Sequence, residues 1–209
     1  LINLNITQAN NSNKPINWFN VLDSEYGVKG DLEESTYLKN FLILKRKLNE
    51  LITANSSVIT HNPWGEYGNT EHIQIFKIIF KIAKEKNVNM IVDGYYSNLT
   101  RFYTSRKQHL LIPKIYSLKT NKKLYSLLKD HYFKNGCWTW FRNYEVPSYE
   151  SFYRVDLSKD VNSNFKYSRI INYPLNYIEM RNPLFQYLRD FFKKILPVRV
   201  KNIYRKIRT

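Results

Sequence analysis

The segment from residue 57 to residue 92 constrains the fold of this chain more than any other. A short apolar strand is predicted at 57–60, a helix with apolar residues every three or four positions at 71–86, and a second strand at 88–92. Strand, helix and strand within about 35 residues make a βαβ unit. The strands of such a unit lie parallel in one sheet, with a right-handed crossover. The segment therefore predicts an α/β domain, and 209 residues are enough for one such domain with a substantial core.

The loop at 60–72 concentrates side chains that can do chemistry. It contains His61 and His72, two of the four histidines, together with Glu66, Tyr67, two glycines and a proline. The carboxyl end of a strand is the edge at which α/β sheets bind ligands. Neutral imidazole is a good zinc ligand, and a carboxylate or a phenol can act as a general acid or a hydrogen-bond donor. The loop therefore predicts a binding or catalytic site, with a capped helix that carries a surface histidine as the plainer alternative.

The first turn of the predicted helix at 71–86 would hold its side chains rigidly. Asn69 or Thr70 can act as the N-cap of this helix. Glu71 then places a negative charge where the helix dipole favours one. His72 lies on the same turn, with its ring held over the loop, so it is a candidate zinc ligand.

Residues 65–72 read Gly-Glu-Tyr-Gly-Asn-Thr-Glu-His. This string resembles the second conserved motif of the PIG-L/LmbE family of zinc-dependent deacetylases, which is roughly Gly-x-Tyr-Gly-His-Pro-Asp-His. That family removes acetyl groups from N-acetylglucosamine-type sugars on lipid, thiol or polysaccharide carriers. The resemblance implies that His72 binds zinc and that Tyr67, Asn69 and Glu71 belong to the catalytic group. On that basis Tyr67 and Asn69 hold the oxyanion, and Glu71 stands at a variable position.

The chain departs from the family pattern in two ways. Asn69 replaces the first histidine of the motif, so it can donate a hydrogen bond to an oxyanion but cannot carry a positive charge. The family's first motif, Ala-His-Pro-Asp-Asp-Glu, supplies the other zinc ligands and the base, and no histidine precedes His61 here. A catalytic zinc normally has three protein ligands, of which the resemblance identifies one. Because the first residue is Leu1, we expect the missing strand, motif and helix to lie upstream in a longer protein.

Further substrate contacts are predicted at the end of the second strand. Tyr96 and Asn98 follow the strand at 88–92 and can reach the same sheet edge as the loop, with a plain turn as an equal alternative. Together with His61 and Glu66, they form the predicted substrate-binding set.

The predicted architecture is a Rossmann-like three-layer α/β/α domain with a mostly parallel sheet over residues 1–170. A basic amphipathic helical segment is predicted over residues 171–209, where Phe and Leu recur at helical spacing among Arg and Lys.

Several other elements are predicted from the same periodicities. A strand is expected at 2–7, and helices are expected at 35–52 and 121–134. A short apolar run at 110–112 ends at Pro113. An aromatic stretch at 137–141 is either core or a platform on which a sugar stacks.

The charge of the chain restricts its partners. The formal net charge is +16, which implies an acidic partner such as nucleic acid, anionic lipid or a phosphate-bearing carrier. A basic amphipathic helix at 171–209 can lie on an anionic membrane surface, where it would meet a lipid-linked amino sugar. No apolar run approaches 20 residues, and no signal peptide is evident. A cytoplasmic location, peripheral on the membrane, is therefore expected, and the single Cys137 excludes a disulfide within the chain.

Three functions are consistent with these observations. The first is zinc-dependent deacetylation of an N-acetylated amino sugar that is linked to a lipid or a polysaccharide. The second is a non-catalytic protein that binds a carbohydrate or its carrier during surface-polysaccharide assembly, which Asn69 and the missing first motif both favour. The third is nucleic-acid binding, drawn from the net charge and the interleaved Tyr and Phe residues, and no known nucleic-acid-binding signature supports it.

Overall fold

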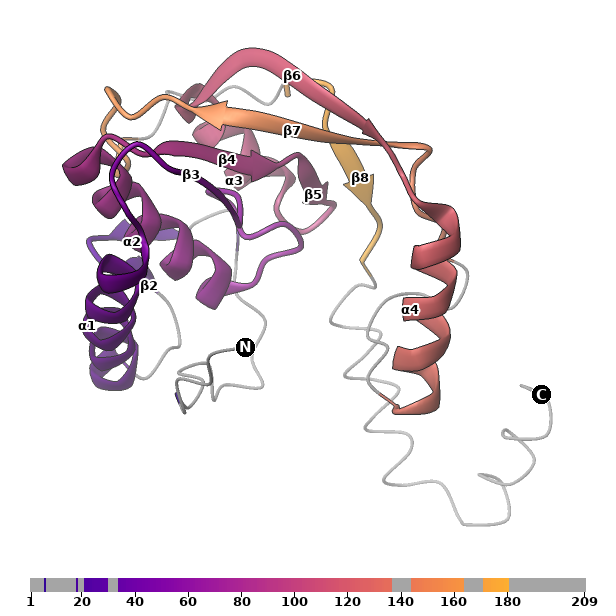
Figure 1. Ribbon diagram of the computed structural model, residues 1–209, viewed down its shortest axis with the longest axis horizontal. Helices are drawn as coiled ribbons and strands as arrows, with labels where there is room; N and C mark the ends of the chain where they lie inside the picture. The colour runs from indigo at the N-terminus through magenta and orange to yellow at the C-terminus, as the bar shows by residue number, and fades with distance from the viewer. Residues whose placement is uncertain are drawn as a thin grey trace. The chain divides into compact units, whose positions relative to one another are not determined.

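The structure of the protein is a computed structural model (Figure 1). The residues that it describes are 6, 18, 21–29, 34–136, 144–163 and 171–180. All of them except Met180 belong to one compact unit, Leu1–Glu179. The predicted strand at 2–7, the aromatic stretch at 137–141 and the apolar and basic part of the C-terminal segment beyond residue 180 lie outside the described residues.

The described residues form a mixed α/β fold with four α-helices, one short 3₁₀ helix and three small sheets. In chain order the elements are β1 Leu22–Ser24, β2 Gly27–Lys29, α1 Glu34–Leu51, β3 Ser57–Thr60, α2 Thr70–Lys86, β4 Asn89–Asp93, β5 Tyr95–Ser97, α3 Arg101–Lys107, η1 Gln108–Leu110, β6 Leu111–Lys119, α4 Lys122–Lys134, β7 Tyr149–Val155 and β8 Asn176–Ile178. None of the helices in these ranges is both long enough and apolar enough to cross a membrane.

The predicted βαβ unit is confirmed, with boundaries within two residues of those expected. β3 and β4 pair in parallel, with Val58 opposite Met90, and α2 connects them (Figure 1). The side-chain oxygen of Asn69 accepts hydrogen bonds from the backbone N–H groups of Glu71 and His72, so Asn69 is the N-cap. The helix ends at Asn87, which adopts the left-handed conformation with φ of 54°.

The largest sheet is mixed, so the prediction of a mostly parallel sheet is wrong. Its strand order is β3-β4-β7-β6, and β7 runs antiparallel to both of its neighbours. Antiparallel strands need no crossover helix, and β6 and β7 form one long ribbon whose connection contains α4. The described residues form a mixed α/β fold, and the three-layer, Rossmann-like arrangement expected over residues 1–170 is not confirmed.

The prediction that the structural element at 110–112 ends at Pro113 is also wrong. β6 continues through Pro113 to Lys119, and the pairing register with β7 shifts between Leu111 and Ile115. Proline is tolerated in an edge strand or at a bulge because it removes a hydrogen bond that the ladder there does not use. β6 is the edge strand of the sheet and has its irregularity at the proline.

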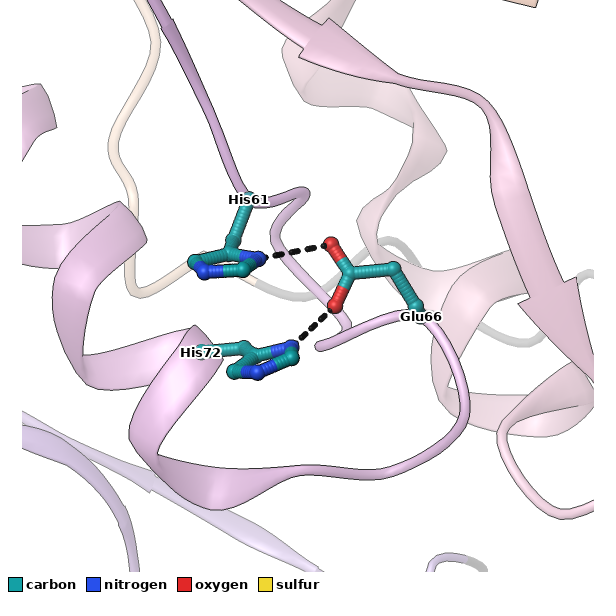
Figure 2. A group of neighbouring side chains, drawn as sticks. All are labelled: His61, Glu66 and His72. Atoms are coloured by element: carbon teal, nitrogen blue, oxygen red, sulfur yellow. Dashed lines mark hydrogen bonds and ion pairs between the residues drawn. The ribbon is translucent and has the colours of Figure 1, made fainter. Parts of the chain in front are cut away.

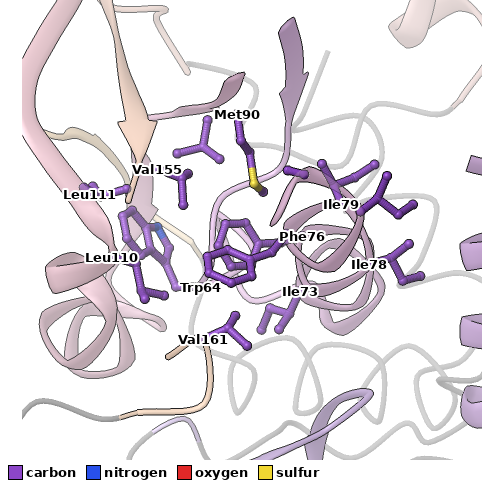
Figure 3. Close-up of a cluster of buried hydrophobic side chains, with 14 of the residues drawn as sticks. Trp64, Ile73, Phe76, Ile78, Ile79, Met90, Leu110, Leu111, Val155 and Val161 are labelled. Atoms are coloured by element: carbon purple, nitrogen blue, oxygen red, sulfur yellow. The ribbon is translucent and has the colours of Figure 1, made fainter. Parts of the chain in front are cut away.

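The hydrophobic core surrounds α2 (Figure 3). Ile73, Phe76 and Ile82 of this helix are almost completely buried, and so is Met90 of β4. Trp64 from the loop after β3 is fully buried among them. Because the indole of Trp64 is held in the core, the loop that precedes α2 is anchored at its centre.

A buried ionic cluster connects the β1–β2 hairpin with α2 and α3. Asp23 Oδ1 lies 3.1 Å from Lys77 Nζ, and Asp23 Oδ2 lies 3.0 Å from Lys107 Nζ. The Tyr103 hydroxyl donates to Asp23 Oδ1 at 2.8 Å. Burial alone would raise the pKa of Asp23, but the two ammonium groups outweigh burial and lower it. The Asp23 carboxylate thus connects the hairpin to both helices through ion pairs with two lysines.

Candidate metal centre

The loop between β3 and α2 is organised by the buried side chain of Asn62. Its amide nitrogen donates to Asp93 Oδ1 at 3.0 Å and to the Tyr95 carbonyl at 2.8 Å. Its amide oxygen accepts from the backbone N–H groups of Trp64 and Glu66. Asx side chains stabilise turns in this way by replacing backbone partners. Asn62 therefore ties the loop to the carboxyl end of β4, next to β3.

Two glycines allow the loop to make its tight turns. Gly68 has φ of +97°, and a Cβ there would lie 2.8 Å from Trp18 Nε1. Gly65 has φ of +67°, and a Cβ there would lie 2.3 Å from the Asn69 carbonyl oxygen. Both positions lie in the left-handed region that L-residues with side chains rarely adopt. The backbone can therefore turn twice between β3 and α2, which points Glu66 back toward the two histidines.

His61, Glu66 and His72 converge at one point (Figure 2). Glu66 Oε1 lies 3.3 Å from His61 Nδ1, and Glu66 Oε2 lies 2.5 Å from His72 Nδ1. The imidazole rings are stacked, with centroids 3.7 Å apart and planes 14° from parallel. One ligand atom from each of the three residues lies within 4.8 Å of the other two. Two imidazoles and a carboxylate are a ligand set that catalytic zinc uses.

Glu66 is buried yet strongly favours its ionised form. Burial by itself would raise its pKa, but hydrogen bonds with His61, His72 and Asp93 outweigh burial and hold the pKa at about 2. A carboxylate that is ionised throughout the neutral range is ready to bind a cation. The donor atoms are therefore chemically suited to a divalent metal such as zinc, and the buried Glu66 supplies the charge that a dication needs.

Asp93 lies next to Glu66, and its surroundings favour its neutral form. Burial raises its pKa well above the usual range, and the negative charge of Glu66 raises it further. The Tyr95 backbone N–H and the Asn62 amide both donate to Asp93 Oδ1. The two carboxyl groups therefore differ: Glu66 favours its ionised form, and Asp93 favours its neutral form.

The structure places the predicted catalytic residues around this cluster. The Tyr67 ring meets the His72 ring edge-on, with centroids 5.6 Å apart. Burial raises the pKa of Tyr67, and a hydrogen bond with Asn69 only partly opposes this, so the phenol is neutral. Asn69 uses its side-chain oxygen as the helix cap. Glu71 lies on the first turn of α2 and accepts a hydrogen bond from the Thr70 hydroxyl at 3.2 Å.

The predicted substrate-binding residues separate into two groups. His61 and Glu66 belong to the possible metal site, so their side chains face each other. The ring of Tyr96 packs on Tyr177 of β8, with centroids 5.4 Å apart, and Asn98 is exposed in the turn after β5. Tyr96 and Asn98 are not members of the group that could hold a metal.

Sequence reasoning missed Asn62 and Asp93. Both lie at the carboxyl edge of the βαβ unit, which is where its ligand-binding residues were expected. The signal that could have found Asp93 is its position as the last residue of β4, next to Gly94. The pairing of Asp93 with Glu66 depends on the tertiary fold and has no local sequence signal.

Comparisons with protein-family models, curated proteins and solved structures find no match for this chain. The geometry and chemistry of the loop are therefore the basis for assigning a function.

Proposed function

We propose that the protein is a metal-dependent deacetylase of N-acetylated amino sugars, of the PIG-L/LmbE type that residues 65–72 resemble. The observation that carries this proposal is the convergence of His61, Glu66 and His72 on one point. The amino-sugar substrate, linked to a lipid or a polysaccharide, rests on the resemblance.

The three residues would together hold one zinc ion. Bound zinc supplies a Lewis acid and a water molecule that is acidic enough to react at neutral pH. The resemblance assigned only His72 as a ligand in this chain, and the geometry adds His61 and Glu66. The local cluster therefore offers three protein ligands, the usual number for a catalytic zinc.

The surrounding residues would position the ligands and the substrate. The backbone N–H of Asn62 donates to Glu66 Oε1 at 3.1 Å and holds the carboxylate toward the histidines. The neutral Tyr67 phenol can donate a hydrogen bond to an oxyanion that forms beside His72. Asn69 positions His72 by capping its helix turn, because its side-chain oxygen accepts the N–H of that residue.

The test is the zinc content of the purified protein together with acetate release from an N-acetylglucosamine oligosaccharide. We expect stoichiometric zinc in the unmodified chain and its loss in His61→Ala, Glu66→Gln and His72→Ala. His131→Ala is the matched control, because His131 is an exposed histidine of α4. A chain that takes up no zinc, or that loses it equally in the control, contradicts the proposal.

A second candidate is a carbohydrate- or carrier-binding protein without catalysis. It is favoured by the hydrogen bonds of Glu66, because both of its carboxylate oxygens already have histidine partners. In that case the histidines have a structural role and need no metal. Calorimetric binding of the oligosaccharide to zinc-free protein, with no acetate released when zinc is added, would favour this candidate.

A further inference from the structure

The surface of α4 differs from that of α2, although both helices are amphipathic. α2 buries ten of its residues in the core. α4 buries none in the described part of the chain. Most of the stability of a helix in a globular protein comes from packing its apolar face. Packing the apolar face of α4 against a partner would therefore stabilise this helix.

Four apolar residues of α4 lie on one side of the helix, whereas Phe133 lies on the other. Leu124, Leu127, Leu128 and Tyr132 are spaced at i, i+3, i+4 and i+8, which places them on one face. Their exposed fractions are 51%, 62%, 49% and 48%. Large apolar side chains that are half exposed and contiguous mark an interaction surface, whereas isolated ones do not.

An adjoining side of α4 is attached to the chain by polar contacts. The Tyr125 hydroxyl donates to the Tyr144 carbonyl at 2.8 Å, and Lys129 Nζ donates to the same oxygen at 3.2 Å. Asn121 caps the start of the helix by accepting from the Leu124 N–H. Among the described residues, these polar contacts of α4 do not involve its leucine face.

The end of the β6–β7 ribbon also exposes large apolar side chains. Tyr116 and Leu118 project from the same face of β6, two residues apart, and are 40% and 59% exposed. Lys119 then leads through a short turn into α4. The end of the ribbon and the helix together form the β6–α4 arm, which is defined as residues 113–136.

The β6–α4 arm is strongly basic. It contains six lysines and one aspartate, a formal net charge of +5. Lys122, Lys123 and Lys134 are exposed on the helix, and Lys114 and Lys119 are exposed on the strand. By helical spacing, Lys122 and Lys129 lie away from the leucine face and Lys123 and Lys134 lie at its border, next to Leu127. Lysines that flank an apolar face in this way fit an amphipathic helix at a charged interface.

We propose that the β6–α4 arm docks on an anionic membrane surface, with the leucine face of α4 in the interface and the lysines at the headgroups. Lysine is depleted at protein–protein interfaces, whereas a leucine face with lysines at its border and on the opposite side is typical of helices that lie on lipid. Each lysine near an anionic surface adds to binding. A helix of 13 residues is about 20 Å long, so it lies in the interface and cannot span the bilayer. The proposal does not rest on the metal centre.

The test is flotation of the full chain with vesicles of phosphatidylcholine and with vesicles of equimolar phosphatidylcholine and phosphatidylglycerol. We expect binding to the anionic vesicles only. Leu127→Glu should weaken that binding about tenfold, since it removes an inserted side chain and adds a repelled charge. Leu42→Glu is the matched control, because Leu42 is 58% exposed on α1, outside the arm.

A second pair of variants tests the charge contribution. Lys122→Glu with Lys123→Glu should reduce binding to anionic vesicles strongly. Lys39→Glu with Arg46→Glu changes the net charge equally on exposed positions of α1 and should reduce it much less. Equal loss in both pairs, or equal binding of Leu127→Glu and Leu42→Glu, overturns the proposal. So does a chain that floats with neither vesicle while Leu127→Glu converts a dimer into a monomer, since the leucine face would then join two copies.

Discussion

The buried ionic cluster predicts an asymmetry between two substitutions at the same contact. Asp23→Asn removes the single carboxylate that serves Lys77 and Lys107 and leaves two buried ammonium groups. Lys77→Met leaves Asp23 paired with Lys107, so the cluster becomes neutral overall. Removing the carboxylate should therefore destabilise the protein much more than removing one lysine.

The magnitude follows from the charges and from the pKa of Lys77. Removing one partner from a buried ion pair typically costs about 3–5 kcal/mol. Burial lowers the pKa of Lys77 to about 8 although Asp23 raises it, so in Asp23→Asn this pKa falls further and Lys77 can lose its proton at pH 7 at a cost below about 1.4 kcal/mol. Lys107 must supply the rest of the penalty. We expect Asp23→Asn to cost about 3 kcal/mol of the free energy of unfolding, and Lys77→Met about 1 kcal/mol.

The same reasoning gives the sign of the pH dependence. The pKa of Lys77 is about 8 in the folded state, against the ordinary lysine value of 10.5 that applies to the unfolded chain. Between these values the unfolded chain binds more protons, so the contribution of Lys77 makes stability rise with pH. Because Asp23 raises the pKa of Lys77, Asp23→Asn lowers it below about 8, and the penalty of the substitution should shrink as the pH rises to about 8.

Urea unfolding followed by tryptophan fluorescence measures both effects, because Trp64 is fully buried in the folded state. Lys81→Met is the control, since Lys81 pairs with the exposed Glu25 and should cost almost nothing. If Lys77→Met destabilises as much as Asp23→Asn, the two lysines do not share one carboxylate as described.

Two further predictions concern the loop. The metal-free protein should lose about 3 kcal/mol of stability as the pH falls from about 4.5 to about 2, because the Glu66 carboxylate has its pKa lowered to about 2 in the folded state and is stabilising only while ionised. Glu66→Gln should flatten that part of the curve in acid unfolding followed by circular dichroism, and an unchanged curve would count against the histidine–carboxylate contacts. Asn69→Ala should cost about 1 kcal/mol by leaving the N–H groups of Glu71 and His72 without their cap, whereas Asn69→Asp should be neutral in thermal unfolding. Equal melting temperatures for the two Asn69 variants would exclude a capping role.

The βαβ unit and its cap could be predicted because their signals are local. The period of the apolar residues in α2, the short strands on either side and the Asn69 cap all lie within one short segment. The same is true of the two histidines and Glu66, which lie in the loop that was singled out. For this part of the chain, secondary structure and site chemistry follow from adjacent residues.

The antiparallel half of the sheet could not be predicted for the opposite reason. β7 pairs with β4 and with β6, and both partners are remote in sequence. From its neighbours in the sequence, Pro113 predicts the end of a strand. A proline is nevertheless accommodated within β6, because β6 lies at the edge of the sheet. Lys77 lies within the apolar pattern of α2, where its ammonium group donates to Asp23, to the Ser24 carbonyl and to Asn162. The pairing of Glu66 with Asp93 likewise exists only after β4 has joined β3.

The three possible metal ligands lie close together in the sequence as well as in space. His61 and His72 are joined by one short loop, so little loop-closure entropy is lost when they meet. Their orientation is a different matter, because it depends on the bonds from Asn62 to Asp93 and Tyr95. Proximity is thus a property of the segment, and alignment is a property of the folded domain. A bound metal would therefore be held weakly by partly unfolded forms that retain the loop, and each such form would lower the apparent contribution of the metal to the stability of the native state.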